Sequence, residues 1–152
     1  MVEIHPGEGP PWLGIFAFGR LTARGVSGIF TTPDPQCLSV VAKGAGYLVR
    51  ADDPSVWSLV QANPIIDVRP IPTWGILVFA EHTRLIAYGE SGVKWRTKRL
   101  TWDDLMIAEV TDEFIRGEFW DVISKSTGEF RVSLATGEHE GGISEHQSGC
   151  EG

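Results

Sequence analysis

The chain has 152 residues, 42% of them hydrophobic and 22% charged, which is the balance of a folded globular domain and excludes a wholly disordered chain. It contains 13 Lys and Arg residues and 20 Asp and Glu residues, which gives a net charge of −7. This charge disfavours general binding to nucleic acid, because that affinity comes mostly from basic residues. Two cysteines are too few for a disulfide framework and indicate a reducing compartment.

The N-terminal segment is rich in residues that break regular structure. Residues 1–11 hold three prolines and two glycines, so we expect an extended arm there. The arm lacks the basic and apolar regions of a signal peptide. No apolar stretch further along approaches the roughly 20 residues that a membrane-spanning helix needs. We therefore expect a cytoplasmic protein that does not associate with membranes.

From residue 12 onward, short segments rich in aromatic and β-branched residues alternate with turns that contain Gly, Pro and Asp. This regular spacing indicates an antiparallel all-β fold. We expect a single meander over residues 12–138, packed as a sandwich, a barrel or a propeller-like array. The expected strands are 12–18, 29–32, 38–42, 47–51, 65–69, 76–80, 85–88, 93–97, 105–110, 114–120 and 130–134.

Helix is scarce in the sequence, and the C-terminal end has little to bury. Short helical turns are suggested only at 55–62 and at 101–106, where Thr101 and Asp104 resemble a capping start. The segment 139–152 is rich in Gly, Glu and His and holds one large apolar residue, Ile143. With so little apolar surface to offset the entropy of ordering, we expect 139–152 to be a disordered tail.

Two parts of the chain align when Leu38 is placed on Ile76. Residues 38–57 then fall on residues 76–95 without a gap, and the alignment indicates a 38-residue internal repeat. A third, degenerate copy is expected at 114–134, with Phe130 in the place of the tryptophan and residues 126–128 as its turn. The coincidences between the first two copies are Ala42 with Ala80, Trp57 with Trp95, and the turn 52–54 with the turn 90–92.

The segment LIAYGESGVKW resembles a blade of quinoprotein-like β-propellers, in which an apolar strand leads through a turn to an aromatic residue. The resemblance covers residues 76–97 and, more loosely, 114–137. It implies four-stranded antiparallel units, of which a chain this short holds about three. As a whole the chain also resembles small uncharacterised bacterial all-β proteins with a closing segment of the type SWDGL…DLATGEHEGG, matched here by 101–105 and 134–142.

His82 is the one histidine inside the expected domain and the weak candidate for a catalytic residue. It lies in Glu81-His82-Thr83, which is expected to be a hairpin turn, and no nucleophile motif accompanies it. An enzyme built around His82 would need an acid from elsewhere, such as Asp67 or Glu81. We therefore predict no catalytic residue, and keep the His82 enzyme as an alternative.

The acidic pairs of the sequence do not have the spacing of a metal site. Neither Asp52-Asp53 nor Asp103-Asp104 matches a calcium-binding loop, and adjacent residues on a strand point to opposite faces. The His and Glu residues of the tail match no structural zinc pattern. We predict no metal site and no cofactor.

Tryptophan is the enriched residue, with six copies. Trp57 and Trp95 occupy matching positions of the repeat and are expected in the core. Trp74 and Trp102 stand beside turn-forming residues and are the predicted binding residues, because exposed tryptophans often carry binding energy. The leading hypothesis is a non-catalytic binding or interaction module with a protein partner. A further alternative, suggested by small size and acidity, is an immunity-type inhibitor of a basic toxin.

Overall fold

The computed structural model describes residues 1–20 and 22–143, and it confirms the all-β fold. Among these residues the only helical turn is the 3-10 turn η1 (Pro72–Trp74), and no helix is long and apolar enough to cross a membrane. The suggested helical turns at 55–62 and 101–106 are not formed. The strands are β1 (Val2–Ile4), β2 (Trp12–Gly14), β3 (Gly28–Thr31), β4 (Cys37–Ala42), β5 (Ala45–Arg50), β6 (Trp57–Leu59), β7 (Asp67–Ile71), β8 (Ile76–Ala80), β9 (Leu85–Gly89), β10 (Gly92–Arg96), β11 (Met106–Val110), β12 (Phe114–Asp121), β13 (Ser126–Ser133) and β14 (His139–Gly141).

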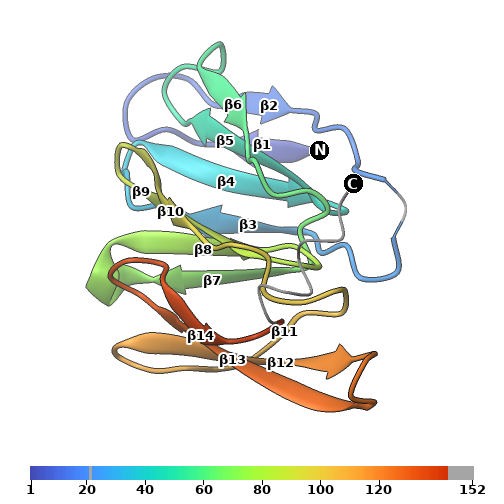
Figure 1. Ribbon diagram of the computed structural model, residues 1–152. Helices are drawn as coiled ribbons and strands as arrows, with labels where there is room; N and C mark the ends of the chain where they lie inside the picture. The colour runs from blue at the N-terminus through green and yellow to red at the C-terminus, as the bar shows by residue number, and fades with distance from the viewer. Residues whose placement is uncertain (21, 144–152) are drawn as a thin grey trace.

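The strands form three four-stranded antiparallel meanders and one two-stranded ribbon. The first sheet is β3-β4-β5-β6, the middle sheet is β7-β8-β9-β10 and the third sheet is β11-β12-β13-β14. The three sheets follow one another from the top of Figure 1 to the bottom, and the β1-β2 ribbon lies beside β5 and β6. Each sheet has two free edges, so the described strands close no barrel, and the barrel alternative is wrong.

Two hydrophobic cores hold the sheets together, one on each face of the middle sheet. Leu77 and Phe79 of β8 face the first sheet, whereas Val78 and Ala80 face the third. Because successive side chains of a strand point to opposite faces, β8 has to be apolar at every position. This explains why Ile76–Ala80 reads as a continuous apolar run with no polar alternation.

The outer faces of the array differ in chemistry. On the third sheet, the Arg116 guanidinium lies within 3.4 Å of Glu109, Glu118 and Glu129, and hydrogen bonds to Glu109 and Glu118 raise its pKa. Residues 101–143 contain ten of the chain's 20 acidic residues and three of its 13 basic ones. The outer face of the first sheet is apolar instead, and the β1-β2 ribbon covers only part of it.

The first and middle sheets share one topology, but the structure aligns them one residue away from the sequence repeat. The β4–β5 hairpin turns at Lys43-Gly44, and both residues have positive φ, as a two-residue hairpin turn requires. In the β8–β9 hairpin, the Glu81 N–H donates to the Arg84 carbonyl across His82-Thr83. Lys43 thus corresponds to His82, whereas the sequence repeat places Lys43 on Glu81.

The one-residue difference matters because a shift of one position moves a side chain to the other face of a sheet. When Lys43 is aligned with His82, Val41 aligns with Ala80. Each of these two side chains faces the next sheet along the chain, Val41 the middle sheet and Ala80 the third sheet. Trp57 and Trp95 are then not equivalent. Trp95 is 6% exposed in the core, whereas Trp57 is 56% exposed, so the expectation that both are buried is wrong for Trp57.

The expected third copy is also displaced. Phe130 lies in β13, the third strand of its sheet, whereas Trp57 and Trp95 lie in the fourth strands β6 and β10. Residues 126–128 begin β13 and form no turn. The segment that occupies the place of that turn is 134–138, which connects β13 to β14.

Both ends of the described chain carry more structure than the sequence indicates. In the expected arm, β1 pairs with β2 and Ile4 is buried. In the expected tail, β14 pairs with β13, and Ile143 is buried with its N–H donating to the Leu100 carbonyl at 2.9 Å. Residues 144–152 of that tail lie outside the described residues.

Candidate functional site

The loop at 97–105 closes over the hairpin turn that carries His82. The His82 carbonyl accepts hydrogen bonds from the Thr101 hydroxyl at 2.8 Å and from the Leu105 N–H at 3.2 Å. The Leu100 N–H donates to the Thr83 carbonyl at 2.7 Å. Because Leu100, Thr101 and Leu105 are all buried, the loop is anchored in the core and its tip is fixed above the turn.

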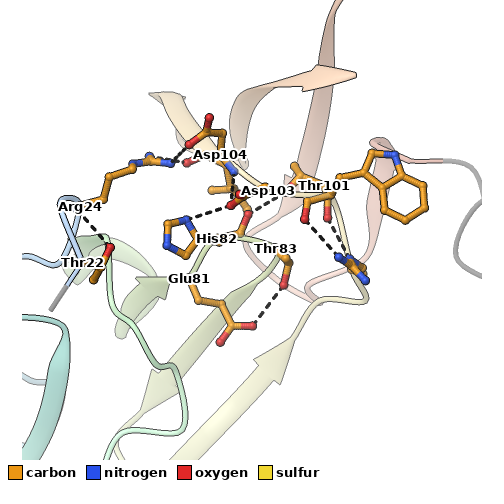
Figure 2. Close-up of polar contacts among 11 residues, drawn as sticks. Thr22, Arg24, Glu81, His82, Thr83, Thr101, Asp103 and Asp104 are labelled. Carbon is orange, nitrogen blue, oxygen red and sulfur yellow. Dashed lines mark hydrogen bonds and ion pairs between the residues drawn. The ribbon is translucent and has the colours of Figure 1, made fainter. Parts of the chain in front are cut away.

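This loop brings Asp103 and Asp104 to His82, and Arg24 lies beside Asp104 (Figure 2). Nδ1 of His82 is closed off from solvent and lies 3.2 Å from Oδ1 of Asp103, although the geometry is not that of a hydrogen bond. Oδ1 of Asp104 accepts a hydrogen bond from Arg24 at 3.0 Å, and Arg24 also donates to the Leu105 carbonyl at 2.8 Å. Residue 104 has a φ of 56°, which aspartate tolerates better than most residues.

His82, Asp103 and Asp104 could together hold a divalent cation. One ligand atom from each lies within 4.8 Å of the others, and nitrogen with two carboxylate oxygens is a donor set that such ions accept. Both aspartates are largely exposed, and the charge of Asp104 is already matched by Arg24. The sequence shows no metal-site spacing because the loop at 97–105, and no local motif, brings the acidic pair to the histidine.

The acids proposed from the sequence as partners of His82 are paired elsewhere. Asp67 forms an ion pair with Arg69 at 3.0 Å, and Glu81 forms one with Arg84 at 3.0 Å. The carboxylate that reaches His82 is therefore Asp103. Any general base at this position would be the His82–Asp103 pair.

Cys37, the one cysteine among the described residues, is not placed as a nucleophile. Burial raises the pKa of its thiol, and a hydrogen bond to Asp34 together with the nearby Asp34 charge raises it further. A thiol that stays protonated near neutral pH is a poor nucleophile.

The two tryptophans predicted to bind are half-buried, not exposed. The Trp74 ring packs against the core between the middle and third sheets, and its Nε1–H donates to the Asp112 carbonyl at 2.6 Å. Trp102 packs against the same core, and the Arg99 guanidinium lies 5.3 Å from the centre of its ring. The tryptophans that are more than half exposed are Trp57, at 56%, and Trp120, at 53%.

Trp57 belongs to an aromatic groove between the outer face of the first sheet and the chain that follows β2. The groove has a volume of about 470 Å³. Ring centroids are 5.3 Å apart for Phe16 and Tyr47, and 6.2 Å apart for Tyr47 and Trp57, and both pairs are tilted. We call this site the aromatic groove, and its lining residues are Trp12, Leu13, Gly14, Ile15, Phe16, Ala17, Tyr47, Val49, Pro54 and Trp57.

Hydrogen bonds fix the two walls of the aromatic groove. The Trp12 Nε1–H donates to the Ala51 carbonyl at 2.7 Å, and the Tyr47 hydroxyl donates to the Ala17 carbonyl at 2.9 Å. Register places Tyr47 and Val49 on one face of β5, while Leu48 between them points to the other face. The walls are therefore held in place before any ligand arrives.

Within the part of the chain that the structure describes, no charged side chain lines the aromatic groove. Arg50, which follows Val49 in β5, lies at the opposite face of the sheet and makes two hydrogen bonds of 2.9 Å to Asp52. These bonds hold the pKa of Asp52 below its usual range. The described lining of the groove is therefore apolar and aromatic, with the Tyr47 hydroxyl as its one polar side-chain group besides the Trp indole N–H groups.

The sequence contains one local signal for the aromatic groove. Trp57-Ser58-Leu59 alternates apolar, polar and apolar residues, which is the pattern of a strand with one apolar face. The expectation of a short helical turn at 55–62 hides this signal, because a helical turn does not place Trp57 and Leu59 on a common face.

Comparisons with known proteins add nothing to this geometry. No family model, no curated protein and no solved structure matches the chain.

Proposed function

We propose that the protein is a non-catalytic interaction module that binds an uncharged, apolar segment of a partner protein in the aromatic groove. The observation that carries the proposal is the exposure of Trp57 over an apolar groove whose walls are already fixed. Trp and Tyr side chains dominate the binding energy of protein interfaces, particularly in pockets that can be fully desolvated.

The surroundings of Trp57 support the same proposal. Leu13 and Ile15 of the groove wall and Leu59 of β6 are also exposed. A contiguous exposed apolar patch is unfavourable in water and commonly marks an interaction surface. Because the walls are preordered by hydrogen bonds, little entropy is lost when a partner binds.

The lining of the aromatic groove also explains why we propose binding and not catalysis. Tyr47 is the one side chain in the described lining with an ionisable group, and its hydroxyl already donates to the Ala17 carbonyl. A nucleophile or a general base needs a free group within hydrogen-bond distance of the substrate.

The test uses a displayed library of random peptides, selected on the wild-type protein. We expect the selected peptides to be uncharged and rich in apolar residues. Trp57→Ala should weaken their binding at least about 30-fold, the loss of roughly 2 kcal/mol that marks an interface hot spot. Trp120→Ala is the matched control, because it removes an equally exposed tryptophan from the charged third sheet and should leave the affinity unchanged.

Two outcomes would contradict the proposal. Peptides that bind Trp57→Ala as tightly as wild type would show that the aromatic groove is not the site. If those peptides were basic, the acidic surface of residues 101–143 would be the interface, and the immunity-type inhibitor would become the better proposal.

The second candidate function is an enzyme centred on His82. The observation in its favour is the 3.2 Å approach of His82 to Asp103, with Asp104 close enough for both carboxylates to bind one cation. In such a site the His82–Asp103 pair would supply a general base, or a bound cation would activate water.

Calorimetric titration with Mn²⁺ tests the cation part of this candidate. If the site holds a divalent cation, wild type should bind one Mn²⁺ and His82→Ala should bind at least tenfold more weakly, about 1.4 kcal/mol. His5→Ala is the matched control, because His5 also lies beside a carboxylate, at 3.3 Å from Glu3, but has no second acid beside it among the described groups. Equal heats of Mn²⁺ binding for wild type and His82→Ala would rule out a cation site at His82.

A further inference from the structure

Within residues 1–20 and 22–143, one side of the strand β6 has no paired neighbour, and its backbone groups there are left without a strand partner. The Arg50 N–H donates to the Val56 carbonyl, and the Val60 N–H donates to the Gly46 carbonyl, so Val56 and Val60 direct their backbone groups toward β5. Backbone direction alternates along a strand, so Ser58 also faces β5, whereas Trp57 and Leu59 direct their N–H and C=O groups away from the sheet. β6 is the edge strand of its sheet, and all three of its residues are exposed.

The fourth strands of the other two sheets, β10 and β14, carry charged residues that protect them from pairing with another molecule. β10 carries Lys94 and Arg96 at the edge of the middle sheet, and β14 carries Glu140 at the edge of the third. Charged side chains on an edge strand prevent pairing with a strand of another molecule. β6 carries no charge, and its Leu59 side chain is 60% exposed.

We propose that two copies of this chain associate by antiparallel pairing of their β6 strands. The two-fold axis passes between the two Ser58 residues, which places Trp57 of each copy opposite Leu59 of the other. These are the residues whose backbone groups point outward, so the pairing forms hydrogen bonds at both positions. It also brings the exposed Trp57 and Leu59 side chains into lateral contact across the pair, on one face of the sheet, which leaves that face open.

A second copy fits this edge better than an unrelated strand for two reasons. The edge is self-complementary, because an apolar residue lies on each side of Ser58 at the spacing that antiparallel pairing requires. It is also uncharged in a chain of net charge −7, so two copies that pair there place no charged strand residues opposite each other. Isologous two-fold pairing is the commonest arrangement of soluble oligomers.

The pairing has a consequence for the proposed function. A two-fold axis perpendicular to the sheet joins two four-stranded sheets into one and places both aromatic grooves on the same face. The dimer would then bind two apolar segments of one partner at once, with an avidity that one groove lacks. The association itself does not depend on that function, because it uses the backbone of β6.

Sedimentation equilibrium of wild type and of two Ser58 variants tests the inference. Wild type should pass from the 16.7 kDa chain to twice that mass as the concentration rises. Ser58→Lys places two like charges opposite each other on the axis and should weaken association at least tenfold, about 1.4 kcal/mol. Ser58→Glu should do the same, and an equimolar mixture of the two variants should recover the dimer.

The outcomes are distinct from those of the peptide experiment. Ser58→Lys should still bind the selected peptides, whereas Trp57→Ala should lose them, so the two proposals can fail separately. Unchanged melting curves show that the Ser58 variants are folded, as expected for an exposed edge residue. A wild type that stays monomeric to about 1 mM, or variants that dimerise as well as wild type, would overturn the inference.

Discussion

Replacing Trp95 with Ala should lower the free energy of unfolding by about 3–5 kcal/mol, the usual cost of truncating a buried aromatic residue. The ring lies in the core between the middle and third sheets, and its Nε1–H donates to the Leu134 carbonyl at 2.9 Å. Gly137, with a φ of 75°, packs against the ring so closely that a Cβ there would lie 2.8 Å from it. The connection to β14 is therefore built around this indole, and the surrounding structure can collapse only partly when it is removed.

The same change at Trp57 should cost less than about 1 kcal/mol, because a half-exposed side chain loses little when it is truncated. Urea unfolding of both variants measures this difference in the free energy of unfolding. The urea midpoints are compared directly if the two variants have equal m-values. If the two losses were equal, Trp57 would be buried as deeply as Trp95, and the correspondence of Lys43 with His82 between the first two sheets would be incorrect.

The existence and type of most strands follow from the sequence, but their register does not. Alternation fixes register where one face of a strand is polar, because a slip of one residue then buries the wrong side chains. Ile76–Ala80 is apolar at every position, since both faces of the middle sheet are covered. Placing Ala80 on Ala42 or on Val41 therefore buries the same number of apolar side chains on this strand, and the sequence contains no reason to choose between the two.

The strands that the sequence does not predict are the short ones, β1, β6 and β14, each of three residues. Alternation over three positions is a weak signal, and at 55–62 the propensity for a helical turn outweighs it. Pairing with a longer neighbour is what makes such segments extended. Propensity within the segment contributes little, which is why the aromatic groove beside β6 is also absent from the sequence-based prediction.

The arrangement of His82, Asp103, Asp104 and Arg24 could be predicted from the sequence only in part. The sequence places His82 in a hairpin turn, and the structure has it there. Asp103 meets it because the Thr101 hydroxyl and the Leu105 N–H bond to the carbonyl of residue 82, far back along the chain. Arg24 reaches Asp104 from a still more distant part of the chain, ahead of the first sheet. Contacts of this range depend on the packed sheets and leave no local pattern in the sequence.

The exposure of Trp74 and Trp102 could not be predicted from the sequence either. Both stand next to turn-forming residues, which favours a surface position, and the structure packs both against the core between the middle and third sheets. A turn fixes where the backbone lies and leaves the direction of a large ring open. The Trp74 ring turns inward because a carbonyl of the β11–β12 connection accepts its N–H.

Ending the chain at Glu138 should lower the free energy of unfolding by about 3–5 kcal/mol, although composition alone predicts that residues 139–152 are dispensable. The truncation removes β14, which pairs with β13, and Ile143, whose burial alone stabilises the fold by roughly 1.5–3 kcal/mol. It also removes the bonds from the N–H groups of Gly142 and Ile143 to the carbonyls of Glu129 and Leu100, at about 1 kcal/mol each.

The reference for this measurement is the chain that ends at Ser144, which keeps every contact named above. Within that chain, Ile143→Ala should account for the side-chain part of the loss and leave β14 paired. Urea unfolding of the three proteins then separates side-chain burial from strand pairing. A chain ending at Glu138 that unfolds at the same urea concentration as the reference would show that β14 does not stabilise the third sheet. The boundary of the domain would then return to residue 138, where composition places it.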